Sequence, residues 1–258
     1  MERNRQIAAI AESEEERMLL VRVCDRIERA MQRQTPAATA FLSQREQALV
    51  RMLLPSCRFF GGIAGAERKL AYWLPEYMEE EDYFNDGPIA CLRASFYEAN
   101  ALTHRDVLGA LMGAGLRRDA VGDICVNETF CDVFVLADLE RYLLDNLTEA
   151  GRQRLRLERI ALSEARKAPQ KMKELRVTVS SLRLDGLISA AFRMSRGSAA
   201  EAIRAGKCAI NSLTCLKPDR SVAEGDEFSV RGCGKGRILC FDGETRKGRL
   251  ALTVGIYG

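Results

Sequence analysis

The chain has 258 residues, of which 47% are hydrophobic and 29% charged, with 39 Lys and Arg against 36 Asp and Glu. These proportions are those of globular domains and exclude a disordered, collagen-like or fibrous chain. No stretch approaches the roughly 20 consecutive apolar residues of a membrane helix, and the acidic start of the chain is unlike a secretion signal, so we expect a cytoplasmic protein of one to three domains.

The first 75 residues are predicted to form a helical domain. A charged helical pattern covers residues 3–34, and a second helix spans 43–54, which a Ser-x-x-Glu capping box opens and a proline ends. Residues 59–69 are predicted to form a glycine turn that leads into a third helix, which reaches Pro75. We therefore expect a helical N-terminal domain over residues 1–75.

Residues 76–162 are predicted to form a second domain in which strands and helices alternate. Apolar periodicity and helix caps indicate the order βαββαβ, with elements at 89–96, 103–113, 122–127, 130–136, 138–147 and 154–160. This is the order of the ferredoxin-like unit, an α+β scaffold that the RRM also uses. The scaffold alone does not determine a function.

Phe130 and Phe134 bear on whether this domain reads RNA as an RRM does. An RRM places stacking aromatics on a central strand that also carries a basic residue and glycines. Here Asp132 lies between the two phenylalanines on one face, and the basic residue and the glycines are missing. The pattern favours packing of both rings in a core, with base stacking as the alternative.

The charge of the chain is unevenly distributed. Residues 1–150 carry 17 basic and 25 acidic side chains, whereas residues 151–258 carry 22 and 11, which gives net charges of −8 and +11. A polycationic C-terminal part indicates a polyanionic partner, either nucleic acid or an anionic membrane surface. Residues 163–178, which are basic and poor in apolar positions, are predicted to link the middle domain to a C-terminal domain over 179–258.

The C-terminal domain is predicted to begin with two helices and to end in strands. An apolar stripe starts a helix near Leu184, and Ser195 caps a shorter helix over 196–205 that Gly206 stops. Free N–H groups at a helix start, with forked arginine donors beside them, are suited to phosphate. Four basic residues lie on or beside the second helix: Arg193, Arg196, Arg204 and Lys207.

A run of spaced residues in this domain carries a family resemblance. It comprises Arg183-Leu184-Asp185, Ser195-Arg196-Gly197-Ser198-Ala199, Ile203, Gly206-Lys207, Asn211, Glu224-Gly225-Asp226 and Val230-Arg231-Gly232. The run resembles the S-four domain, the alpha-L RNA-binding motif. This resemblance implies an RNA-facing surface made by Arg183, Ser195, Arg196, Ser198, Lys207 and Asn211.

Further motifs extend the resemblance over nearly the whole chain. They are Phe60-Gly61-Gly62, Ala66-Glu67-Arg68-Lys69, the stretch from Leu102 to Leu111, and Gly122-Asp123-Ile124. With the C-terminal run they resemble the YlmH family of bacterial proteins, which joins a helical N-terminal part, an RRM-like middle and an S-four domain. The resemblance implies RNA binding without catalysis, on the rRNA of the large (50S) ribosomal subunit and on tRNA, in rescue or quality control of stalled ribosomes.

A glycine-rich run near the C-terminus adds three basic residues, Arg231, Lys235 and Arg237. Its glycines would let the backbone approach a ligand, and we expect the three cations to contact RNA. A bulged hairpin is the alternative explanation of the glycines. The charge predicts that phosphate contacts dominate, with steep salt dependence and little sequence preference.

The cysteines and the single histidine are the candidate ligands for a metal ion. The nine cysteines form no CxxC pair, and structural zinc requires closely spaced ligand pairs, so we expect no metal site. Most cysteines lie in apolar segments, as in Ile124-Cys125-Val126 and Leu239-Cys240-Phe241, which predicts buried, reduced thiols.

Two residues are candidates for catalysis. Asp185 lies in an Arg-Leu-Asp tripeptide like the one that carries the nucleophile of pseudouridine synthases, but here the tripeptide opens a helix, where the helix dipole favours a carboxylate. His104 is the sole histidine, and no matching nucleophile motif accompanies it. We expect a non-catalytic protein with no cofactor, small-molecule substrate or membrane partner. An RNA-modifying enzyme, and a cell-division adaptor that binds anionic lipid, are the alternatives.

Overall fold

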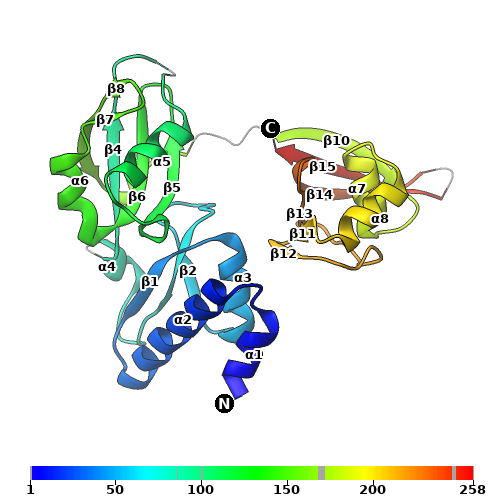
Figure 1. The fold of residues 1–258 in the computed structure, drawn as a ribbon, viewed down its shortest axis with the longest axis horizontal. Helices are drawn as coiled ribbons and strands as arrows, with labels where there is room; N and C mark the ends of the chain where they lie inside the picture. The colour runs from blue at the N-terminus through cyan, green and yellow to red at the C-terminus, as the bar shows by residue number, and fades with distance from the viewer. Residues whose placement is uncertain (1, 86, 100, 168–171, 246–247, 258) are drawn as a thin grey trace. The chain divides into compact units, whose positions relative to one another are not determined.

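Two compact units, Met1–Ala168 and Pro169–Gly258, make up the chain. The computed structural model describes residues 2–85, 87–99, 101–167, 172–245 and 248–257. Helices and antiparallel sheets occur in both units (Figure 1). The predicted domains over 1–75 and 76–162 therefore belong to a single unit, which we call unit 1, and the C-terminal part is unit 2.

Unit 1 begins with three helices and a three-stranded sheet. The sheet has the order β1-β3-β2, and both strand pairs are antiparallel. Ser43 and Glu46 form the predicted capping box at the start of α3. The elements are α1 (Glu2–Ile10), α2 (Glu14–Arg33), β1 (Ala37–Leu42), α3 (Gln44–Leu53), β2 (Arg58–Phe60) and β3 (Lys69–Trp73).

The expectation of a wholly helical N-terminal domain is wrong. The segment before Pro75 that was expected to be a helix is β3, the central strand of the first sheet. Leu70, Ala71 and Tyr72 are buried in succession. Such a run lacks the alternation by which a half-exposed strand is identified in a sequence. The partners of β3 are β1 and β2, so distant pairing decides its conformation.

The second half of unit 1 contains a four-stranded antiparallel sheet of order β5-β6-β4-β9. The predicted order βαββαβ is confirmed. Thr103 and Asp106 form a capping box on α5, whereas Asp138, the first residue of the helix expected over 138–147, lies within the 3-10 turn η2. The elements are α4 (Glu80–Asn85), β4 (Ile89–Ser95), α5 (His104–Gly113), η1 (Arg118–Ala120), β5 (Val121–Val126), β6 (Phe130–Leu136), η2 (Ala137–Leu139), α6 (Glu140–Asn146), β7 (Glu149–Ala150), β8 (Gln153–Arg154), β9 (Arg156–Ile160) and η3 (Leu162–Glu164).

Both faces of this four-stranded sheet are covered. Leu111 of α5 and Leu143 of α6 belong to the core on one face. On the other face, the fully buried Phe134 of β6 packs in a cluster with Phe41 of β1 and Leu70 of β3. The two sheets of unit 1 therefore share a core, which is why the chain does not divide near residue 75.

Gly62 and Gly122 lie where these two sheets approach each other. A Cβ on Gly122 would lie 2.6 Å from Cε1 of Phe41, and a Cβ on Gly62 would lie 2.5 Å from Cδ1 of Phe134. Gly62 also has a φ of +86°, which favours glycine. Close packing thus explains the glycines of two motifs on which the family resemblance rests.

Asp123 connects the motif of Gly122 to the motif Ala66-Glu67-Arg68-Lys69. Its Oδ2 accepts a hydrogen bond from the backbone N–H of Glu67 at 2.9 Å, and its Oδ1 accepts one from Arg68 at 2.9 Å. The Arg68 side chain turns inward and donates to the carbonyls of Phe41 and Val121. These motif residues therefore hold unit 1 together.

The basic segment predicted as a linker is only partly one. Arg166 donates its backbone N–H to Asp132, and Lys167 Nζ lies 3.1 Å from Oδ2 of Asp123, so both residues are docked on unit 1. Residues Met172–Val179 form strand β10 rather than a linker. Pro169 and Lys171 lie outside the described residues.

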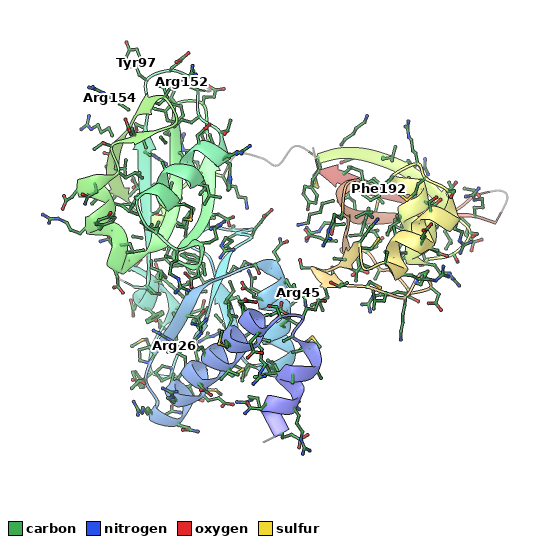
Figure 2. All side chains as sticks on the ribbon, viewed as in Figure 1. Arg26, Arg45, Tyr97, Arg152, Arg154 and Phe192 are labelled. Carbon is green, nitrogen blue, oxygen red and sulfur yellow. The ribbon has the colours of Figure 1, made fainter. Side chains whose placement is uncertain are left out.

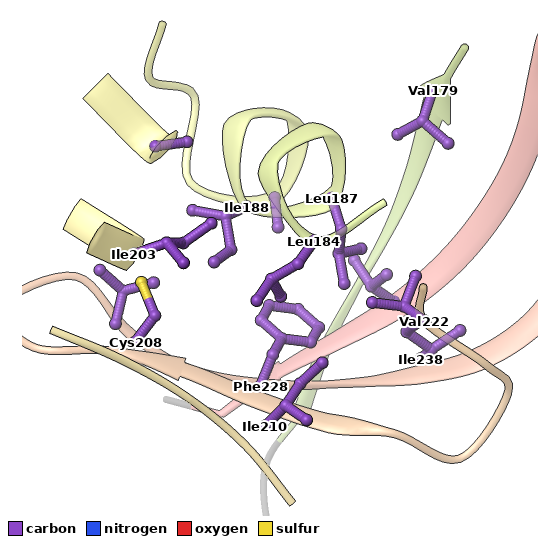
Figure 3. Close-up of a cluster of buried hydrophobic side chains, with 14 of the residues drawn as sticks. Val179, Leu184, Leu187, Ile188, Ile203, Cys208, Ile210, Val222, Phe228 and Ile238 are labelled. Atoms are coloured by element: carbon purple, nitrogen blue, oxygen red, sulfur yellow. The ribbon is translucent and has the colours of Figure 1, made fainter. Parts of the chain in front are cut away.

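Unit 2 is a six-stranded antiparallel sheet, of order β10-β15-β14-β13-β11-β12, with two helices. Figure 3 shows its core, where Leu184 and Ile188 of α7 lie above Phe228 of the sheet. Both helices occur where they were expected. The elements are β10, α7 (Leu184–Ala191), α8 (Arg196–Arg204), β11 (Cys208–Ile210), β12 (Leu213–Thr214), β13 (Glu227–Val230), β14 (Gly234–Glu244) and β15 (Leu250–Tyr257).

All nine cysteines are free thiols, and seven of them are buried as predicted. Burial raises the pKa of the Cys91 thiol to about 12 and that of Cys125 to about 11. Cys233 and Cys240 are exposed. The prediction is wrong for Cys240, which follows an irregularity in the pairing of β14 with β15 that begins at Ile238.

Candidate nucleic-acid interface

The start of α8 is built by two serines of the predicted RNA-facing set. Ser195 Oγ accepts a hydrogen bond from the backbone N–H of Ser198 at 3.0 Å, which confirms Ser195 as the N-cap. The two hydroxyls lie 2.7 Å apart. Ala199 and Ile203 are fully buried, so α8 presents its opposite side, which includes Arg196 and Arg204, to solvent.

Arg183 and Arg196 meet at one buried carboxylate, that of Asp185. Arg196 donates from Nε to Oδ2 at 3.0 Å and from Nη2 to Oδ1 at 3.2 Å. Arg183 donates to both oxygens at 3.3 and 3.4 Å. Burial works against the charge of Asp185, but the hydrogen bonds from Arg196 and Arg183 outweigh it and lower the pKa of the carboxyl group. Asp185 thus orients both arginines.

A basic pocket of about 500 Å³ lies between β10 and α7. We call it the arginine pocket and define it by its four basic residues. None of the described residues that line it is acidic. Such a depression is suited to phosphate, which takes paired donors from guanidinium groups. The four arginines are Arg176, Arg193, Arg196 and Arg249.

The arginines of the pocket differ in how they are held. Arg249 donates from Nη2 to the carbonyl oxygen of Thr178 at 2.7 Å, and Arg176 Nε lies 3.4 Å from Oδ2 of Asp242. Arg193 has a left-handed φ of +53° between the two helices, and its side chain is exposed. The pocket therefore combines anchored and free cations.

Sequence reasoning found Arg193 and Arg196 but missed Arg176 and Arg249. A signal for Arg176 was present, because it alternates along β10 with the buried Val177 and Val179 and must face away from the core. For Arg249 no signal was present, because its place beside Thr178 results from the pairing of β10 with β15.

Arg204, Lys207 and Arg231 form a second exposed group at the C-terminal end of α8. The carbonyl oxygen of Lys207 accepts a hydrogen bond from the N–H of Arg231 at 2.8 Å, which brings the two residues together. All three side chains are exposed. The structure therefore brings together three predicted site residues that are separated by up to 27 positions in the sequence.

The remaining predicted site residues are engaged within unit 2. Asn211 Nδ2 donates to Oδ1 of Asp226 at 2.7 Å, and Asn211 Oδ1 accepts from the N–H of Glu227 at 3.0 Å. Glu227 also lies 3.0 Å from Lys235 Nζ and 3.8 Å from Arg237 Nε. These residues stabilise the β13–β14 region, and their charges are partly balanced.

The glycine-rich run is a hairpin, which was the alternative explanation. Val230 pairs with Gly234 across the turn between β13 and β14. A Cβ on Gly236 would lie 2.7 Å from Phe228. The glycine at this position therefore makes room for a core side chain and not for a ligand. Phe192, which is labelled in Figure 2, packs edge-on against Phe228 with ring centroids 5.8 Å apart.

The two candidates for catalysis lie in different units. Both oxygens of Asp185 are occupied by arginine donors, and its side chain is 7% exposed. His104 is exposed at the first position of α5. Among the described residues no cluster of three His, Cys, Asp or Glu side chains has the geometry for a metal ion. In the same part of the chain, no helix has the length and apolar character needed to cross a bilayer.

Comparisons with known proteins identify the family. Residues 96–164 match the family model described as "Putative RNA-binding domain in YlmH". The chain is 35% identical over 221 residues to ribosome-associated protein quality control protein P2 of Bacillus subtilis (strain 168), which covers 83% of this chain and 85% of that protein. The chain belongs to the YlmH family. A solved structure of cell division protein YlmH from Streptococcus pneumoniae has 21% identity and a TM-score of 0.51, covers 60% of this chain and 96% of its own, and shows a shared fold.

The sheet face on which an RRM stacks bases is closed in this YlmH family member. Phe134 is fully buried under the N-terminal sheet, and the guanidinium of Arg93 lies 4.3 Å above the ring of Phe130. Arg93 is held there by two hydrogen bonds to the buried Asp132, of 2.7 and 2.8 Å. The prediction of core packing is confirmed for Phe134. Phe130 is half-buried with Arg93 over its ring, and base stacking stays an untested alternative.

Proposed function

We propose that this YlmH family protein binds RNA through unit 2 and associates with the ribosome in the quality control of stalled ribosomes, without catalysing a reaction. The arginine pocket is the observation that carries the proposal. It gathers four guanidinium groups in one depression, and none of the described residues that line it is acidic. The relative from B. subtilis, whose name states ribosome association and quality control, supports the cellular role.

The mechanism of binding follows from the chemistry of the pocket. Arginine forks bind phosphate oxygens with two parallel hydrogen bonds, and they position RNA without reading its bases. Arg196 is pre-oriented by Asp185 and Arg249 by Thr178, so less side-chain entropy is lost when phosphate binds. We therefore expect binding that weakens steeply with salt and depends little on sequence.

The finer parts of the proposal concern fold and partner. The spaced residues of unit 2 support an S-four assignment, and the βαββαβ order supports an RRM-like assignment for the middle of unit 1. We propose rRNA of the large subunit and tRNA as the RNA partners, and the cytoplasm as the location. Asp185, whose carboxylate is saturated with donors, is proposed to serve as a positioning group for Arg183 and Arg196.

Cosedimentation with ribosomal subunits tests this proposal. The full chain is expected to travel with 50S particles on sucrose gradients at low salt. Replacement of Arg193 and Arg249 by Glu should lower the affinity tenfold or more, on the order of 1.4 kcal/mol or greater. Arg220→Glu, an exposed change in unit 2 outside the lining of the arginine pocket, is the matched control. Absence of the wild-type chain from the 50S fractions would sink the proposal.

A further inference from the structure

A row of arginines follows the exposed side of α2, although residues 1–150, which include this helix, carry a negative net charge. Four arginines occupy positions i, i+4, i+7 and i+11 of α2, and this spacing places all four on one side of the helix. They line a groove of about 420 Å³ together with Ala30, Thr35 and Ala37, which extends to the beginning of β1. Arg26 is labelled on α2 in Figure 2. We call this the α2 groove, and its arginines are Arg22, Arg26, Arg29 and Arg33.

The α2 groove carries an excess of positive charge that the described residues of its lining do not balance. Asp25 is the acidic residue among its described lining, and it pairs with Arg29 at 3.6 Å. No hydrogen bond or ion pair joins Arg22, Arg26 or Arg33 to another described residue. All three side chains are exposed. Three free guanidinium groups in one groove repel one another, and an anion would relieve that repulsion.

The opposite side of α2 explains why these arginines face solvent. Leu20, Val23, Cys24 and Ile27 are buried in unit 1 and hold the helix in place. Ser13 caps its first turn, and Gln34 ends it in a left-handed conformation. The groove therefore stands on a rigid, twenty-residue helix. The helix backbone therefore fixes the spacing of the four arginines, and only their side chains have to be ordered when an anion binds.

We propose that the α2 groove binds the sugar-phosphate backbone of an RNA strand. The four arginines advance along α2 in steps of about 4.5 to 6 Å and span about 16 Å, a spacing that suits consecutive phosphates of an extended strand. Each guanidinium offers a fork of donors to a phosphate. The inference rests on the proposed function, RNA binding, and adds a second contact site in unit 1.

The lining of the groove favours RNA over an acidic peptide. Protein–protein interfaces gain much of their affinity from a few large side chains that fill well-packed pockets. The apolar lining here consists of Ala30 and Ala37, which are small and present no such pocket. Phosphate contacts require none, so the composition matches a sugar-phosphate backbone.

Binding of a fluorescein-labelled oligouridylate to the full chain tests the inference. The variant Arg26→Glu with Arg33→Glu is expected to bind at least tenfold more weakly than the wild type. The slope of log K against log salt should fall by about 0.7 for each phosphate of the single strand that the variant no longer neutralises. Arg17→Glu, an exposed change on α2 outside the groove, is the matched control and should bind as the wild type does.

A neutral pair, Arg26→Gln with Arg33→Gln, separates charge from folding. It should show the same helical circular dichroism as the wild type and an intermediate loss of RNA affinity. Unchanged RNA affinity in both double variants would overturn the inference. If the double variants kept RNA binding but lost binding to a labelled polyglutamate, the inference would also be overturned. The groove would then be assigned to a protein partner.

The same titration distinguishes failure of this inference from failure of the proposed function. Variants of Arg193 and Arg249 test unit 2, and variants of Arg26 and Arg33 test the α2 groove. If the unit 2 variant loses RNA and the α2 variant does not, the inference alone fails. If the wild type binds no RNA, both fail.

Discussion

Asp185 of α7 and Arg196 of α8 form an ion pair with two hydrogen bonds, of 3.0 and 3.2 Å, between guanidinium and carboxylate. The pair connects the first turns of the two helices and lies at the edge of the arginine pocket. Arg183 binds the same carboxylate. One buried carboxylate therefore orients two of the cations expected to face RNA.

Asp185→Asn should destabilise unit 2 and weaken RNA binding together. The amide keeps the size of the side chain but loses the charge that holds Arg196 and Arg183. We expect the free energy of unfolding to fall by about 1 to 3 kcal/mol in urea titrations. Asp219→Asn, an exposed change in the same unit, is the control. Equal stabilities of the two variants would contradict the role given to Asp185.

The same ion pair predicts a pH dependence. The pKa of Asp185 is lowered below its ordinary value of 3.8, because the arginine hydrogen bonds outweigh the effect of burial. A carboxyl group with a lowered pKa stabilises the fold above its unfolded pKa and loses that effect as pH falls through its folded pKa. The difference in stability between wild type and Asp185→Asn should be full at neutral pH and shrink below about pH 4. A difference that persists unchanged in acid would argue against this cause.

Phe130→Leu tests whether the sheet of unit 1 stacks bases. Because Arg93 covers the Phe130 ring and Phe134 is buried, the change should leave RNA affinity within about twofold of the wild type. Stability should fall by about 0.5 to 1 kcal/mol, because leucine offers no ring face to the Arg93 cation. A large loss of RNA affinity with the fold intact would show that the sheet face opens to RNA.

Gly122→Ala and Gly109→Ala are a matched pair of substitutions. A methyl group on Gly122 would lie 2.6 Å from Phe41, so we expect a loss of about 1 to 3 kcal/mol in the free energy of unfolding. A methyl group on Gly109, within α5, meets nothing within 4 Å and should stabilise the helix by about 0.5 to 1 kcal/mol. Thermal or urea denaturation measures both, and a stabilising Gly122→Ala would contradict the close approach of the two sheets.

The order of elements was predictable because local chemistry determines it. The capping box of Ser43 and Glu46, the cap at Thr103 and the cap at Ser195 each lie within a few residues of the helix they start. A largely apolar run after a short polar connection identified β6, and glycine stopped α8. Strand β3 was not predicted because its conformation depends on pairing with β2 and with β1, which lies far from it in the chain.

The sum of charges along the sequence was the weakest predictor of where basic surfaces lie in the fold. Of the basic excess assigned to residues 151–258, the stretch 151–168 holds six basic and two acidic residues and belongs to unit 1. The negative net charge of residues 1–150 also gave no indication of the arginines that line the α2 groove. A sum along the chain cannot say which face of an element carries the charge.

By itself, the sequence determined the helices and most strands, the burial of most cysteines and the family resemblance, because these depend on residue type and short spacing. The tertiary structure alone decided that the N-terminal sheet closes the face of the middle sheet and that Arg176, Arg193, Arg196 and Arg249 line one pocket. The physical reason is that strand pairing and helix packing bring together residues far apart in the chain, and only their meeting creates a buried face or a cluster of cations.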